Sequence, residues 1–161
     1  MDEQIRNNLL KVSSELSLYS AIPPSKIEEV FKFNPLVEME ATDSRKLSTY
    51  TVMLAQYLIT LQVSFNTARV QASQKKKVLD RKVTTILQAG GVEGKTLKER
   101  EANAVASSPE LQALSSDYDQ AAAERDLLEG LDRPITELIN AFKAELRRRA
   151  DERHYTERER S

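Results

Sequence analysis

Two long stripes of apolar residues at helical spacing constrain this chain more than any other feature. The first stripe runs from Leu47 to Ile86 and the second from Leu111 to Leu146, almost always in steps of three, four or seven residues. Side chains at this spacing line one face of a helix, and such a face needs a helical partner to leave water. Each stripe can be the partner of the other. The sequence therefore predicts an all-α fold, built on a long antiparallel, coiled-coil-like helical hairpin.

Prolines and charge divide the chain into three predicted segments. Residues 1–40 are expected to form short helices, the first over residues 2–19, because Pro23-Pro24 cannot continue a helix. Residues 41–153 are expected to form the long hairpin. Residues 154–161 are expected to be a frayed, charged tail.

Glycine and proline also set the limits of the hairpin arms. The arms are expected at about 43–89 and 108–153, with the turn near 89–108, because Gly90 and Gly91 end the first arm. Pro134 lies inside the second arm and predicts a kink or a split near Asp132.

Capping signals predict where two further helices begin. Ser25 and Glu28 fit a capping box at the start of the second short helix, and Thr96 and Glu99 fit another after the glycine turn. In such a box the side chains of the first and fourth residues bind each other's backbone amides. Both signals are local, so they predict helix starts without any knowledge of the tertiary structure.

The composition leaves little material for catalysis or metal binding. The chain has no Cys, and its one His, His154, lies in the charged tail, so a zinc site would need carboxylates alone. No apolar run approaches the roughly 20 residues of a membrane span. The acidic N-terminus is also unlike a secretory signal. We therefore expect no enzymatic activity, no metal, no cofactor and no membrane association, and a cytoplasmic location, the cytoplasm of an infected host cell included.

Residues 89–96 satisfy a relaxed phosphate-loop pattern, with Ala89 in place of the usual first glycine. In a nucleotide-binding loop the backbone amides would hold phosphates, Lys95 would reach the outer phosphates and Thr96 would hold magnesium. Such a loop also needs a strand before it and a parallel sheet around it, which the pattern of this chain does not predict. The favoured interpretation is a glycine-terminated helix, a turn and a threonine cap.

Charge is strongly segregated along the chain. Residues 69–98 carry eight basic and two acidic groups, net +6, and residues 99–146 carry four basic and eleven acidic groups, net −7. Cations spaced along one helix can follow a phosphate backbone. The candidate nucleic-acid-binding residues are Arg69, Lys75, Lys76, Lys77, Arg81 and Lys82.

A second interpretation of these cations remains open. On a helical wheel Lys77 and Arg81 point outward, whereas the other four flank the apolar stripe. An antiparallel hairpin would bring the flanking cations close to the acidic second arm, where they could form charge pairs, as at the edges of a coiled coil. The acidic candidates are Asp117, Asp119, Glu124 and Asp126.

Further apolar residues on the first arm favour self-association. They lie outside the stripe and would enlarge the apolar surface of a bare hairpin, which is typical of a protein contact. These residues are Tyr50, Val52, Met53, Tyr57 and Ile59. We expect a homo-oligomer, unless the N-terminal helices cover this surface and leave a monomer.

The order of these parts resembles a known family. An acidic N-terminal region precedes Leu47 and Tyr50, a lysine-rich stretch at 75–77 ends at a glycine turn, and a second helix bears Tyr118 and the segment 138–143. This order is similar to that of the UvsY-type recombination mediators of phages, over roughly residues 35–150. The resemblance implies a phage-encoded homo-oligomer that binds single-stranded DNA and helps a recombinase to replace single-strand-binding protein in DNA recombination. It assigns DNA contact to the lysine-rich end of the first arm.

A different class of protein also fits the pattern. A helical phage scaffold, assembly protein or chaperone would need the same long helices and the same apolar surface, without nucleic-acid contact. The two classes differ in the role of the basic cluster, which binds DNA in a mediator and pairs with the second arm in a scaffold.

Overall fold

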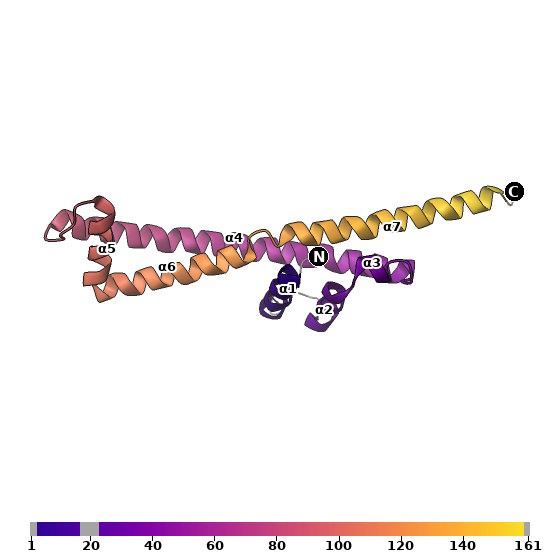
Figure 1. The fold of residues 1–161 in the computed structure, drawn as a ribbon, viewed down its shortest axis with the longest axis horizontal. Helices are drawn as coiled ribbons and strands as arrows, with labels where there is room; N and C mark the ends of the chain where they lie inside the picture. Colours follow the sequence, from indigo (N-terminus) through magenta and orange to yellow (C-terminus); the bar gives the residue numbers. More distant parts are fainter. Residues whose placement is uncertain (1–2, 17–22, 160–161) are drawn as a thin grey trace. The chain divides into compact units, whose positions relative to one another are not determined.

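The computed structural model describes residues 3–16 and 23–159, and these residues form helices joined by turns, with no strand among them (Figure 1). This confirms the predicted all-α class. The helices are α1 (Glu3–Leu16), α2 (Pro24–Lys32), α3 (Pro35–Glu38), α4 (Ser44–Ala89), α5 (Leu97–Ser107), α6 (Pro109–Leu128) and α7 (Asp132–Glu159). The end of the predicted first helix, residues 17–19, lies outside the described residues.

The chain divides into two compact units. Unit 1 comprises residues 1–64 and 129–161, and unit 2 comprises residues 65–128. The long helix α4 has 46 residues and contributes its first part to unit 1 and its second part to unit 2. Unit 2 also contains α5 and α6, and unit 1 also contains α1, α2, α3 and α7.

Helix α4 begins and ends close to the predicted limits of the first arm. The side chain of Asp43 accepts a hydrogen bond from the amide of Lys46 at 2.9 Å, as an N-cap does. The helix ends at Ala89, and Gly90 follows with a φ of 82°, a conformation that favours glycine.

The glycine turn leads into α5 through the predicted capping box. The amide of Glu99 donates to Thr96 Oγ1 at 3.1 Å, and the amide of Thr96 donates to Glu99 Oε2 at 3.3 Å. This confirms the helix-cap interpretation of Thr96. The predicted capping box at Ser25 is wrong, because α2 already begins at Pro24 and has no capping side chain. A proline in the first turn has its φ preset for the helix and lacks the amide that a cap would satisfy.

The second arm is split at the predicted place. Helix α6 ends at Leu128, Gly130 adopts a φ of 78°, and α7 begins at Asp132. Pro134 therefore lies in the first turn of α7, where its missing amide costs no hydrogen bond. Helix α7 continues past residue 153 to Glu159.

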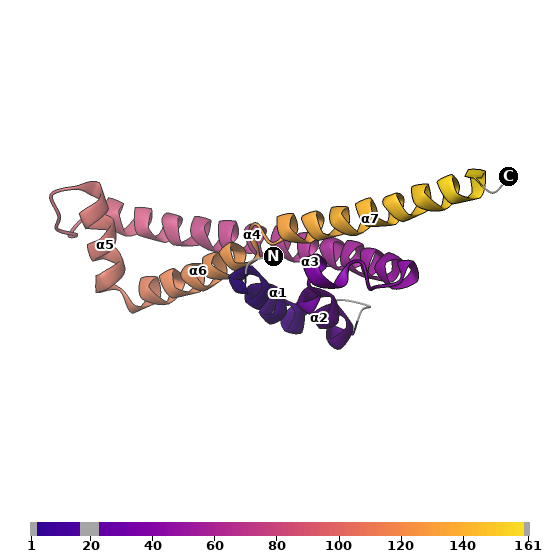
Figure 2. The same cartoon turned by 45° about the vertical axis from the view of Figure 1, so that its right-hand side comes forward.

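Aromatic residues of α2 and the turn after it form the centre of unit 1. The Phe33 ring packs edge-on against Tyr50 of α4 and Phe142 of α7, with ring centroids 5.6 and 5.4 Å apart. Phe31 packs in the same way against Tyr57 at 5.3 Å. Helix α1 packs beside α2 (Figure 2). The N-terminal segment thus covers both tyrosines.

This cover is only partial. Tyr50 and Tyr57 are buried and Met53 is half-buried, but Val52 and Ile59 remain exposed on α4. The N-terminal helices cover one side of α4, and an apolar side stays open to solvent.

Unit 2 is a helical hairpin closed by α5. One core cluster in this unit joins Val83 of α4, Ala104 of α5 and Leu111 of α6. Half-buried residues packed against this core are Leu79, Ile86, Leu87, Val92, Val105 and Leu114.

Candidate nucleic-acid interface

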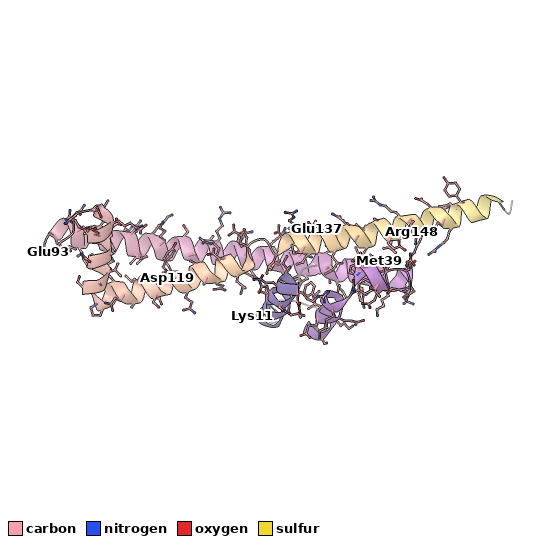
Figure 3. The ribbon with its side chains drawn as sticks, viewed as in Figure 1. Lys11, Met39, Glu93, Asp119, Glu137 and Arg148 are labelled. Carbon is pink, nitrogen blue, oxygen red and sulfur yellow. The ribbon has the colours of Figure 1, made fainter. Side chains whose placement is uncertain are left out.

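All six predicted nucleic-acid-binding residues lie on α4 within unit 2, and all six are exposed. They span less than four turns of one unbroken helix, so the helix alone sets their spacing. Figure 3 shows the side chains that project from this part of α4 and from α6.

Two of the six cations reach across the hairpin. Lys82 Nζ lies 2.8 Å from Glu110 Oε1, in an ion pair whose side chains are both largely exposed. Lys75 Nζ donates to the backbone carbonyl of Asp117 at 3.3 Å. These contacts join α4 to α6 in antiparallel order. Lys82 thus forms a charge pair across the hairpin, whereas Lys75 forms a hydrogen bond to a neutral carbonyl.

The other four cations have no partner within the described part of the chain. The side chains of Arg69, Lys76, Lys77 and Arg81 form no hydrogen bond and no ion pair there, and each residue is exposed. Lys77 and Arg81 are four residues apart, so they project from the same side of the helix. We call Arg69, Lys76, Lys77 and Arg81 the free cations of α4.

The acidic residues expected to face the basic cluster do not pair with it. Asp117 contributes its carbonyl oxygen and not its carboxylate, and Asp126 pairs with its neighbour Arg125 at 2.5 Å. Asp119 and Glu124 are exposed and have no partner among the described residues. The carboxylate that does pair is Glu110 in the first turn of α6, which lies opposite Lys82.

The glycine turn uses its own amides. The amides of Lys95 and Thr96, which a phosphate loop would direct to a nucleotide, donate to the Glu99 carboxylate at 2.8 and 3.3 Å. Asn103 Nδ2 donates to the carbonyl of Glu93 at 2.8 Å and holds the turn against α5. These bonds favour the structural role of the turn.

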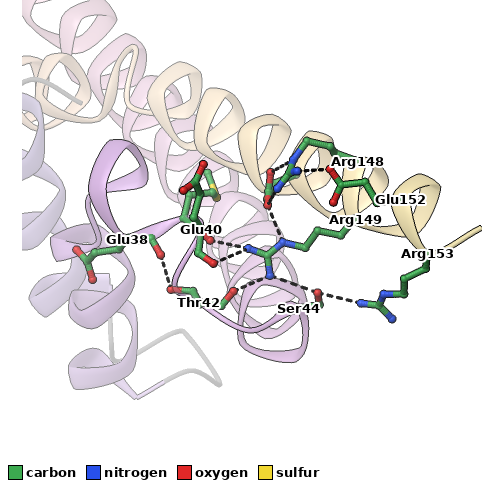
Figure 4. Close-up of polar contacts among 10 residues, drawn as sticks. Glu38, Glu40, Thr42, Ser44, Arg148, Arg149, Glu152 and Arg153 are labelled. Carbon is green, nitrogen blue, oxygen red and sulfur yellow. Dashed lines mark hydrogen bonds and ion pairs between the residues drawn. The ribbon is translucent and has the colours of Figure 1, made fainter. Parts of the chain in front are cut away.

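A polar cluster in unit 1 was missed by the sequence reasoning. The guanidinium of Arg149 on α7 donates to the carbonyls of Met39 and Thr42 and to Glu145 Oε1, each at 2.6 Å (Figure 4). Its side chain is only 15% exposed. Arg149 therefore fastens α7 to the turn that leads into α4. The spacing of Glu145 and Arg149 by four residues signals a helical ion pair, but nothing in the sequence indicates the carbonyl partners.

The neighbouring Arg148 points to a different set of partners. Its guanidinium bridges Glu145 and Glu152, with its closest nitrogens 2.8 and 2.5 Å from the two carboxylates. Hydrogen bonds from Arg148 and Arg149 lower the pKa of the Glu145 carboxyl to about 2. Of the arginine run at 147–149, only Arg147 is exposed without a partner in the described residues.

A second polar group ties α2 to α4. Tyr50 Oη donates to Glu29 Oε1 at 2.5 Å, and Lys46 Nζ lies 3.0 Å from the same oxygen. The hydrogen bond from Tyr50, with that from Lys46, lowers the pKa of the Glu29 carboxyl. Tyr57, one heptad further along α4, has a buried hydroxyl with no hydrogen-bond partner among the described residues, and its burial raises the pKa of the phenol.

The described residues contain no group of three or more His, Asp or Glu side chains that could hold a metal ion. Over the same residues, no helix has both the length and the apolar character needed to cross a membrane. No protein-family model, curated protein or solved structure matches the chain.

Proposed function

We propose that this chain is a non-enzymatic accessory protein that binds single-stranded DNA through the free cations of α4 and helps a recombinase to assemble on the strand. The observation that supports DNA binding is the division of the basic cluster. The hairpin engages only Lys75 and Lys82, and four exposed cations remain available on the same helix. Cations that serve only the hairpin would all be expected to face α6.

The chemistry of these cations suits a phosphate backbone and no particular base sequence. Lysine and arginine bind phosphates as charges and displace counterions, so binding is expected to be insensitive to sequence and to weaken steeply with salt. The exposed part of α4 in unit 2 has no aromatic residue for base stacking, because Phe65 is half-buried. We therefore expect weak, mainly electrostatic binding.

The test is fluorescence anisotropy with a labelled oligonucleotide at low salt. The double change Lys77→Glu with Arg81→Glu is expected to weaken binding at least tenfold and to flatten its salt dependence. Because both residues are exposed, the free energy of unfolding of this variant is expected to stay within about 0.5 kcal/mol of that of the unmodified protein.

The chain offers a matched control for net charge. Lys143 and Arg147 on α7 are also exposed, four residues apart and without a partner in the described part of the chain. Changing both to Glu alters the net charge by the same amount, so it should leave most of the DNA affinity intact. An equal loss in both variants would show that binding is not located on α4.

The recombinase role rests on the order-of-parts resemblance to UvsY-type mediators and has a separate test. The chain is expected to shorten the lag before a recombinase assembles on a strand covered with single-strand-binding protein. If the chain binds DNA but does not change that lag, the recombinase role is wrong and only the DNA-binding part of the proposal remains.

The alternative is a helical scaffold, assembly protein or chaperone without nucleic-acid contact. It is favoured by the exposed apolar residues Val52, Ile59 and Val63 of α4. If the unmodified protein fails to bind the oligonucleotide at every concentration short of aggregation, this alternative replaces the mediator.

A further inference from the structure

Residues 34–40, which include the short helix α3, display two apolar side chains in unit 1. Leu36 is 96% exposed and Val37 is 74% exposed, the two largest values among the large apolar residues that the structure describes. A side chain exposed to this extent has almost no apolar neighbour within the chain. We call residues 34–40 the acidic tip, because they carry Glu38 and Glu40 and no basic residue.

Hydrogen bonds within the acidic tip define its backbone. The amide of Leu36 donates to Asn34 Oδ1 at 3.2 Å, and the amide of Asn34 donates to Glu38 Oε1 at 2.8 Å. The amide of Glu38 in turn donates to the carbonyl of Asn34 at 2.9 Å. These reciprocal bonds between side chains and backbone close the turn as a capping box closes a helix start. The segment therefore has a defined conformation, although its two large apolar side chains face solvent.

Both ends of the acidic tip are anchored to the rest of unit 1. Phe33, directly before it, is buried between the rings of Tyr50 and Phe142. At the other end, the guanidinium of Arg149 donates to the carbonyl of Met39 at 2.6 Å (Figure 4). A segment that is already held loses little conformational freedom when a partner binds it, and this lowers the cost of association.

The acidic tip and the turn after it are negatively charged. Residues 34–43 carry three carboxylates and no basic group, and all three acidic residues are exposed. Lys32, the last cation before the tip, pairs with Glu28 at 3.5 Å. The Arg149 guanidinium is occupied by backbone carbonyls and a carboxylate of its own helix. The negative charge around the two apolar side chains is therefore left for a partner to match.

This combination of charge and apolar surface fits a protein and excludes two other classes of partner. Carboxylates repel the phosphates of a nucleic acid and of an anionic lipid surface. Apolar side chains that insert into a pocket dominate the binding energy of many protein interfaces. Charged groups at the border of such a contact select a partner of opposite charge. The complementary surface is an apolar pocket bordered by lysine or arginine.

We propose that the acidic tip binds the recombinase, with Leu36 and Val37 in an apolar pocket that basic residues border. This inference rests on the proposed function, which supplies a partner of the required charge, because a protein that assembles on DNA carries a basic surface. The free cations of α4 lie in unit 2 and the acidic tip lies in unit 1. Surfaces of opposite charge do not compete for one ligand, so the chain can hold the strand and the recombinase together.

The first test is calorimetric titration of the full chain with the purified recombinase encoded in the same genome, without DNA. Leu36→Ser with Val37→Ser is expected to weaken binding by about tenfold or more. The control is Val70→Ser with Val78→Ser, two residues of α4 in unit 2 that are 54% and 45% exposed. The control should change the affinity by less than about twofold. All four residues are exposed, so circular dichroism should show equal helix content in both variants.

The second test addresses the charge of the acidic tip. The carboxylate of Glu40 has no partner among the described residues. Glu40→Lys is expected to weaken recombinase binding by about fivefold and to reduce its salt dependence. Glu124→Lys makes the same change at an exposed site in unit 2 and should leave the affinity within about twofold.

Anisotropy with the labelled oligonucleotide separates this inference from DNA binding. Leu36→Ser with Val37→Ser should keep the DNA affinity within about twofold of that of the unmodified chain, because the free cations are intact. If the unmodified chain does not bind the recombinase, the recombinase role and the contact at the acidic tip are both wrong, and anisotropy still decides DNA binding.

Two other results would overturn the inference alone. If the unmodified chain binds the recombinase and the tip variant binds it equally well, the contact lies elsewhere and the recombinase role stands. If the tip variant loses self-association in sedimentation equilibrium and keeps its affinity for the recombinase, a second copy of the chain occupies the acidic tip.

Discussion

The guanidinium of Arg149 donates to oxygens from two distant parts of the sequence. Its shortest hydrogen bonds, each 2.6 Å, go to the backbone carbonyls of Met39 and Thr42, more than 100 residues away in sequence, and to Glu145 Oε1 of its own helix. Among the described residues, its neighbour Arg148 binds carboxylates of its own helix only. Arg149 therefore joins α7 to the turn before α4, whereas Arg148, one residue earlier, forms contacts within α7.

Replacing Arg149 is expected to destabilise the protein. Arg149→Ala would leave carbonyls without their donor and remove a charge-assisted bond, at a cost of about 1–3 kcal/mol in the free energy of unfolding. Arg147→Ala is the control, because Arg147 is exposed without such partners, and its effect should stay within about 0.5 kcal/mol. Urea unfolding followed by circular dichroism measures both. Equal effects would show that the Arg149 contacts do not form in solution.

The lowered pKa of Glu145 predicts an acid-sensitive contribution to stability. The folded-state pKa is about 2 and the ordinary value is 4.5, so the unfolded chain binds the proton more readily. The contribution is present above pH 4.5 and is lost as the pH falls toward 2. In Glu145→Gln this part of the loss should be absent, so the difference in unfolding free energy between the two proteins should shrink with falling pH. Parallel stability curves over this range would contradict the prediction.

At the scale of elements, the limits of α4, α5 and α7 follow from local signals. Asp43 and Thr96 cap helix starts, Gly90 follows a helix end, and Pro134 lies in a first turn, all as the sequence indicates. A cap depends on residues within one turn, so the sequence contains all the information it needs. At Ser25 two local signals compete, and the proline determines the start.

The two capping boxes read from the sequence provide a matched test. Thr96→Ala removes a cap that exists and is expected to cost about 1 kcal/mol of stability. Ser25→Ala removes a side chain that makes no cap contact and is expected to change stability by less than about 0.5 kcal/mol. Thermal unfolding of both variants measures the two changes in stability. A larger loss of stability for Ser25→Ala than for Thr96→Ala would contradict the assignment of the caps.

At the scale of the whole molecule, the two proposed surfaces belong to different units and use different chemistry. The free cations of α4 lie in unit 2, and the exposed apolar residues Val52, Ile59 and Val63 lie in unit 1. One surface would act through charge and depends on salt, and the other acts through apolar burial.

The two surfaces are therefore expected to be separable by mutation. Val63→Glu should weaken self-association and leave the affinity for an oligonucleotide short enough for one chain within about twofold, because it adds only one charge in the other unit. Lys77→Glu with Arg81→Glu should weaken DNA binding and leave self-association unchanged. Anisotropy and sedimentation on the same preparations measure both. A loss of both properties in either variant would show that the surfaces are coupled.

The sequence by itself determined the helical class, most helix limits and the position of the split in the second arm. These features depend on periodicity, caps and prolines, which act over a few residues. It also located the basic cluster on one helix, because spacing along a helix needs no tertiary information.

Only the tertiary structure decided which side chains are engaged. It pairs Lys82 with Glu110, gives the side chains of Lys77 and Arg81 no partner among the described residues, and places Arg149 on the carbonyls of Met39 and Thr42. It also places α2 over Tyr50 and Tyr57 while Val52 and Ile59 stay exposed. The physical reason is that such contacts depend on the register and rotation of packed helices, and a shift of one residue turns a side chain by about 100° about the helix axis.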